Sequence, residues 1–175
     1  MTPMQHGGPA PLILTAMLPD DLHAWATALR RDYFPPERNF LDAHVTLFHA
    51  LPPSAESEVR DCCAALARCN APVPARLVGL MKLGKGTAIQ LESDRMLAIR
   101  LDLAERFHGL LTPQDEHAPR LHITIQNKVS IEEAKALQAS LGPQIIPRNF
   151  AFAGLSLHAY RGGPWEHIKS WRFRG

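Results

Sequence analysis

The chain has 175 residues, of which 46% are hydrophobic and 21% are charged, and its formal net charge is +2. These values are typical of a folded domain and exclude an intrinsically disordered chain. They also exclude a strongly basic nucleic-acid coat protein, so any recognition of phosphate has to come from a local site.

The N-terminal apolar segment LILTAML, residues 12–18, follows no basic segment and is followed at once by Pro19. This arrangement favours a first strand over a signal peptide. No apolar run reaches membrane-spanning length. The three cysteines, Cys62, Cys63 and Cys69, fall in one predicted helix without Cys-x-x-Cys spacing, which favours reduced, buried thiols. We therefore expect a soluble cytoplasmic protein.

Hydrophobic periodicity and capping residues predict an alternation of strands and helices. The first half reads as a strand over 12–18, a helix over 20–33, a strand over 44–51, a helix over 53–69 and a strand over 76–83. The second half repeats this order as a strand over 87–91, a helix over 94–111, a strand over 121–129, a helix over 131–142 and a strand over 150–160. A last strand within 165–173 closes a hairpin with residues 150–160.

The middle strand of each half begins with His-x-Thr, and Pro35 and Pro113 each stand nine residues before that histidine. The repeated order and the repeated motif together indicate an internal duplication with units at about 11–84 and 86–160. We expect the whole chain, 1–175, to form one α+β domain with mainly antiparallel sheets. A pseudo-twofold axis between the units would place the two motif strands in equivalent positions.

The two motifs are HVTL at 44–47 and HITI at 122–125. Alternate side chains of a strand share a face, so each histidine and its threonine lie on one face about 7 Å apart. The same alternation adds Phe48 to the first face, and it adds Gln126 and Lys128 to the second. The apolar residues between them are expected to point into the core.

Two histidines on either side of a phosphorus atom suit in-line displacement, in which one group removes a proton and another donates one. Histidine can do both because its ordinary pKa is about 6.5. We expect His122 to act as base on water and His44 as acid on the leaving ribose oxygen, although the near-symmetric motifs leave these roles open. Thr46 and Thr124 would hold phosphate oxygens, and no metal is needed.

HVTL and HITI resemble the paired signatures of the 2H phosphoesterase superfamily, in particular its bacterial and archaeal 2′-5′ RNA ligases and cyclic nucleotide phosphodiesterases. The resemblance implies a bilobed α+β fold whose central cleft is lined by His44, Thr46, His122 and Thr124. It implies chemistry without a metal or other cofactor. It also implies, as partner, an RNA end or nucleotide with a 2′,3′-cyclic phosphate or a 2′-5′ linkage. The polar sequence after the second motif, Gln126-Asn127-Lys128, departs from many members. We expect a monomer.

Other residues near the motifs have two interpretations each. Phe48 would stack on a base or belong to the core, and Tyr160 with Trp165 would form a second stacking wall. Lys128 and Arg120 would attract phosphate or lie solvated on the surface. His49 and His117 are interpreted as surface or structural residues.

Three alternative sites are weaker. Residues 79–87 resemble a P-loop, but Gly86 follows the lysine and a strand is expected next, so a hairpin turn is favoured. A zinc site of His44, His49 and His122 lacks short ligand spacing, and no nucleophile elbow supports a Ser-His-Asp triad. The alternative function is a non-catalytic module that binds a nucleotide or an RNA end.

Overall fold

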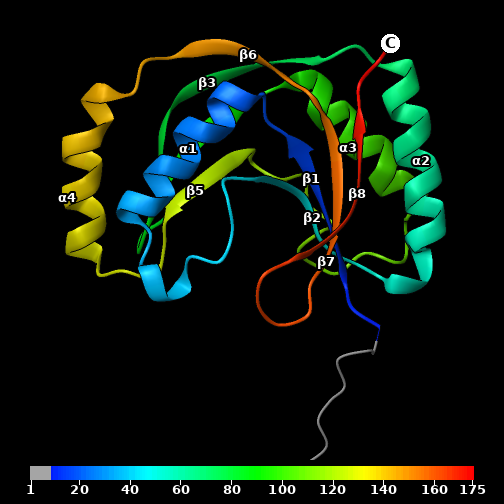
Figure 1. Cartoon of the computed structure of the whole chain (residues 1–175), viewed down its shortest axis with the longest axis horizontal. Helices are drawn as coiled ribbons and strands as arrows, with labels where there is room; N and C mark the ends of the chain where they lie inside the picture. Colours follow the sequence, from blue (N-terminus) through cyan, green and yellow to red (C-terminus); the bar gives the residue numbers. More distant parts are fainter. Residues whose placement is uncertain (1–8) are drawn as a thin grey trace, which may run out of the picture.

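The computed structural model describes residues 9–175, which form two four-stranded antiparallel sheets and four α-helices (Figure 1). The strands are β1 (Leu12–Met17), β2 (Val45–Leu51), β3 (Val73–Lys82), β4 (Thr87–Glu92), β5 (His122–Gln126), β6 (Arg148–Phe152), β7 (Gly154–Ala159) and β8 (Glu166–Arg172). The helices are α1 (Asp20–Tyr33), α2 (Glu56–Cys69), α3 (Asp94–Arg106) and α4 (Ile131–Leu141). Short 3-10 turns lie at Pro36–Arg38, Pro53–Ala55 and Gly142–Gln144.

The predicted α+β class with antiparallel sheets is confirmed. One sheet has the order β2-β1-β7-β8 and the other has the order β5-β4-β3-β6. The two orders match if β2 and β1 of the first sheet correspond to β5 and β4 of the second. The next position is then held by β7 in the first sheet and by β3 in the second, so each half of the chain contributes its third strand to the sheet of the other half. Each sheet therefore contains strands from both halves of the chain. The matched orders are what a duplication would produce, and the repeats at 11–84 and 86–160 remain a proposal.

Local sequence explains where the helices begin and end. Helix α1 follows Pro19, carries Asp20 and Asp21 in its first turn, and ends just before Pro35. The two carboxylates favour the helix N-terminus electrostatically, and proline cannot continue a helix. Helix α4 has the predicted Ser130 cap, whose hydroxyl accepts a hydrogen bond from the Glu133 amide at 3.1 Å.

Three predicted elements are longer than the structure allows. The strand predicted over 121–129 is β5, which ends at Gln126. Helix α3 ends at Arg106 and not near Leu111, because the chain turns after Phe107 and Gly109 adopts a positive φ of 89°. The strand predicted over 150–160 is two strands, β6 and β7, which lie in different sheets. The break precedes Gly154, where a Cβ atom would lie 2.1 Å from the Trp171 carbonyl oxygen. Only glycine allows strand β8 to approach so closely.

The apolar residues of both motifs are fully buried, as predicted. Val45, Leu47, Ile123 and Ile125 are each 0% exposed and belong to one hydrophobic core cluster. Strand β2 contacts strand β5, so the two motif strands meet although they belong to different sheets. No helix within residues 9–175 has both the length and the apolar character needed to cross a bilayer.

Candidate active site

The two motif histidines are held in the same way. The Nδ1 atom of His44 lies 2.8 Å from the carbonyl oxygen of Asp42, and the Nδ1 atom of His122 lies 2.6 Å from the carbonyl oxygen of Arg120. In both cases the carbonyl belongs to the residue two positions earlier. A carbonyl oxygen can only accept, so Nδ1 carries the proton and Nε2 is left available for chemistry in each neutral ring.

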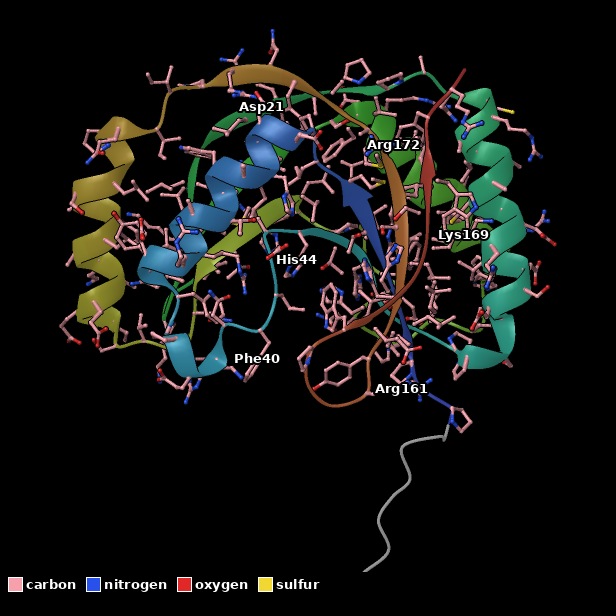
Figure 2. All side chains as sticks on the ribbon, viewed as in Figure 1. Asp21, Phe40, His44, Arg161, Lys169 and Arg172 are labelled. Atoms are coloured by element: carbon pink, nitrogen blue, oxygen red, sulfur yellow. The ribbon has the colours of Figure 1, made fainter. Side chains whose placement is uncertain are left out.

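His44 lies near the centre of the molecule, at the end of the loop that also carries Phe40 (Figure 2). His122 lies within electrostatic range of this side chain, and the strands that carry the two motifs contact each other. The pKa of His44 is lowered to about 4, mainly by burial and also by the positive charge of Arg30, although the hydrogen bond to Asp42 opposes this shift. His44 is therefore uncharged at neutral pH.

Residues of both motifs border one cleft of about 480 Å³. His44 comes from the first motif and Thr124 from the second. We call this the cationic cleft because three basic side chains line it: Arg30, Arg38 and Lys128. The arrangement suits an anion, since the charges converge where a histidine Nε2 and a threonine hydroxyl are close by. Thr46 is half-buried on β2, where it pairs with Thr15 of β1.

Phe48 and Gln126 do not lie on the faces that simple alternation predicts. Strand β2 has a bulge at Leu47 and strand β5 has one at Ile125, each three residues after the motif histidine. Phe48 is consequently 0% exposed and packs under the guanidinium of Arg100, which lies 4.0 Å from the ring centroid. The structure therefore places Phe48 in the core, which was its alternative interpretation. Gln126 is 5% exposed and its Oε1 accepts from Thr87 Oγ1 at 3.0 Å. Neither side chain is available to a substrate.

The remaining candidates divide between the cleft and the surface. Lys128, Tyr160 and Trp165 line the cationic cleft. Lys128 has a positive φ of 59°, which is uncommon outside glycine and often marks a functional position. Arg120 borders a different cavity, beside β4 and the start of α3, and contributes its carbonyl group to His122.

The two further histidines have different surroundings. His49 is bound to the buried carboxylate of Asp115 through its amide and its Nδ1, at 2.9 and 3.2 Å. His117 is exposed. Both positions agree with the structural or surface roles expected of them.

A second cavity, of about 500 Å³, adjoins His44 on the side of β1 and β7. We call it the aromatic cavity because Phe40 and Trp165 line it together with the histidine His158. The Trp165 ring lies 4.6 Å from that of His44 and 5.4 Å from that of His158. Burial and the neighbouring His167 lower the pKa of His158 to about 4. None of the described side chains that line this cavity is lysine or arginine.

Sequence reasoning missed Arg30, Phe40 and His158. Arg30 and Phe40 follow no recognisable motif. His158 lies on β7, 36 positions after His122. Only the exchange of third strands between the sheets brings β7 beside β1 and close to the first motif. Among residues 9–175, no group of three or more His, Cys, Asp or Glu side chains is arranged to hold a metal ion.

A family model described as the 2′-5′ RNA ligase superfamily matches residues 18–164. The chain belongs to this superfamily. Membership indicates an enzyme of the phosphoesterase or ligase type, and the match covers both His-x-Thr motifs. No curated protein sequence matches the chain.

Solved structures share the fold of this chain. The crystal structure of TT0787 of Thermus thermophilus superposes with a TM-score of 0.66 at 19% identity and covers 94% of this chain and 98% of its own. Escherichia coli LigT in complex with 3′-AMP gives a TM-score of 0.64 at 17% identity, over 96% of this chain and all of LigT (100%). LigT in complex with NADP+ gives 0.63 at 16% identity, over 95% and 99% of the two chains. At these identities, the similarity between this superfamily member and those proteins is one of fold.

Proposed function

We propose that this protein is a metal-independent phosphodiesterase that opens 2′,3′-cyclic phosphates of RNA ends or nucleotides. The observation that carries the proposal is the identical anchoring of His44 and His122, each through Nδ1 to the carbonyl oxygen two residues earlier. Two neighbouring imidazoles that both present Nε2 can supply the base and the acid of an in-line displacement. Superfamily membership supports the same type of chemistry.

The roles in this proposal are opposite to those expected from sequence. The pKa of His44 is lowered to about 4, so its Nε2 holds a lone pair at neutral pH and suits the base that removes a proton from water. His122 then donates a proton to the leaving ribose oxygen. Thr46 and Thr124 hold the non-bridging oxygens. A bond forms between the water oxygen and phosphorus as the bond between phosphorus and the ribose oxygen breaks. His44 accepts one proton from water, and His122 gives one proton to the ribose oxygen.

The two cavities beside His44 suggest how a nucleotide would lie. The cationic cleft suits the phosphate, with Lys128 and Arg38 near its charge. The aromatic cavity has no lysine or arginine among its described lining and suits an uncharged base. Trp165 borders both cavities, so a base would stack there, with Tyr160 close by. LigT was crystallised with 3′-AMP, a nucleotide of the product class. If a 5′-hydroxyl group of RNA replaced water as the nucleophile, the same ring opening would join two RNA ends through a 2′-5′ linkage, with the 3′ oxygen as the leaving group that takes the proton.

The decisive experiment incubates the protein with 2′,3′-cyclic AMP in the presence of a chelator and separates 2′-AMP from 3′-AMP. We expect multiple turnovers and a single product isomer, because a fixed acid protonates only one ribose oxygen. Binding of the cyclic nucleotide without any turnover would contradict the proposal and favour a non-catalytic nucleotide-binding or RNA-end-binding module. A requirement for a divalent metal would contradict the two-histidine mechanism.

Replacement of Trp165 by alanine is expected to raise the KM for 2′,3′-cyclic AMP by about tenfold, because one base–aromatic stack contributes about 1–3 kcal/mol. The measurement is steady-state hydrolysis, with glycerol 1,2-cyclic phosphate as a second substrate that has no base. Its KM should change little. The control is Trp25→Ala, since Trp25 is 38% exposed on α1 and lines neither cavity beside His44. Equal effects on both substrates would show that Trp165 supports His44 and does not bind the base.

A further inference from the structure

Arg30, near the C-terminal end of α1, is only 3% exposed and connects the two halves of the site. Its Nε donates to the carbonyl oxygen of Leu41 at 3.1 Å, in the loop that leads to His44. Its Nη1 donates to the carbonyl oxygen of Thr124 at 2.7 Å, in the second motif. Nε and Nη2 also donate to Asn39 Oδ1, at 3.3 and 3.1 Å. A single side chain therefore connects the two motifs.

The guanidinium of Arg30 is a buried charge without an ionic partner. Burial lowers its pKa to about 10, and Asp42 opposes that shift, so the group remains charged at neutral pH. No carboxylate within residues 9–175 lies at ion-pair distance from it. A guanidinium has five N–H groups, and the hydrogen bonds to Asn39, Leu41 and Thr124 occupy three of them. The guanidinium also packs on the ring of Phe34, at 4.2 Å from the ring centroid. A buried cation that contacts neutral oxygens and an aromatic ring, with no carboxylate at ion-pair distance, is costly for folding, which points to a use beyond stability.

We propose that Arg30 binds the substrate phosphate and positions the two motif histidines around it. Arg30 lines the cationic cleft beside His44 and Thr124, and a phosphate oxygen would supply the anion that the guanidinium lacks. Its hydrogen bonds to the loop before His44 and to the second motif fix the separation of the two motifs. That separation determines how the proton donor and the proton acceptor lie relative to phosphorus. This inference rests on the proposed function for its catalytic part, whereas the phosphate-binding part can be tested without turnover.

The fold provides a matched control in Arg100 on α3. Arg100 is also 3% exposed, and its Nε donates to the carbonyl oxygen of Leu47 at 3.1 Å, in the first motif strand. Its guanidinium, however, packs on the buried ring of Phe48 and donates to the carbonyl oxygen of Asp115, in the core. Arg30 and Arg100 are therefore equally buried and similarly bonded, but only Arg30 lines the cationic cleft.

The first experiment measures binding of inorganic phosphate by titration calorimetry to the wild type, Arg30→Met and Arg100→Met. We expect Arg30→Met to weaken phosphate binding at least about tenfold, the effect of losing one charge-assisted contact. We expect Arg100→Met to stay within about twofold of the wild type while both variants unfold at lower temperatures. Equal phosphate affinity in the wild type and Arg30→Met, or no phosphate binding by the wild type, would overturn the proposal.

The second experiment separates charge from geometry with Arg30→Lys, which also serves if Arg30→Met does not fold. Lysine keeps the charge but cannot bond Leu41 and Thr124 together, so phosphate affinity should be largely retained while kcat for 2′,3′-cyclic AMP falls about 10²-fold. Because the charge of Arg30 lowers the pKa of His44, the acidic limb of the pH profile should move to higher pH in Arg30→Met. An unchanged kcat in Arg30→Lys would remove the positioning role. If phosphate binding depends on Arg30 but the protein shows no turnover, the proposed function is wrong and the assignment of Arg30 to phosphate binding still holds.

Discussion

Replacement of either His44 or His122 by alanine is expected to lower kcat for 2′,3′-cyclic AMP by about 10²- to 10⁴-fold, the usual contribution of general acid–base catalysis. In each ring a backbone carbonyl occupies Nδ1, which leaves Nε2 available for proton transfer. Loss of either ring removes one of the two proton transfers. The double variant should be little slower than the weaker single variant, since the two histidines act as a unit.

His117→Ala is the matched control, because this histidine is exposed and lies outside the cavities beside His44. It should keep the wild-type rate. The pH profile then assigns the roles. With His44 as base, the acidic limb of kcat/KM should fall below the ordinary histidine pKa of about 6.5, because the pKa of His44 is lowered. Wild-type rates in both single variants would show that the motifs have no catalytic role.

Asp115→Ala is expected to destabilise the protein by about 2–4 kcal/mol, because it removes a buried carboxylate and leaves the partly buried amides that it binds without acceptors. The Asp115 side chain is 1% exposed and accepts hydrogen bonds from the amides of His49 and Ala50 at 2.9 Å each. These amides lie on β2, five and six residues after His44, so the carboxylate anchors the strand that carries the first motif. Denaturant unfolding is the measurement. Glu116→Ala, at an exposed neighbour, should change the stability by less than about 0.5 kcal/mol.

The same carboxylate gives the stability a pH dependence with a definite sign. Burial alone would raise the pKa of Asp115, but the hydrogen bonds from His49 and Ala50 outweigh burial and lower it. A lowered pKa in the folded state means that this contribution is fully present above the unfolded value of about 3.9 and is lost as the pH falls through the folded value. The difference in stability between wild type and Asp115→Asn should therefore shrink below about pH 4. A constant difference down to about pH 2 would contradict this account.

Local patterns were sufficient for the order of most helices and strands and for the burial of the four apolar motif residues. Val45, Leu47, Ile123 and Ile125 are buried as alternation requires, and helix α1 has its predicted bounds. These features depend on backbone sterics, capping and the period of a strand, which neighbouring residues determine. Phe48 and Gln126 do not point where strand alternation predicts, because a bulge in each motif strand turns the side chain after it inward. A bulge is fixed by the partner strand, and that partner is distant in sequence.

The sequence by itself determined the α+β class, the two His-x-Thr strands and the chemistry that such side chains can perform, because these follow from residue type and short-range spacing. Only the tertiary structure decided which strands pair, that β7 and the loop after it bring His158 and Trp165 close to His44, and that Arg30 joins the two motifs. Those contacts join residues up to 147 positions apart, as the pairing of Leu12 in β1 with Ala159 in β7 shows. Contacts of this range form where the packing of the two sheets places them, and no local pattern encodes them.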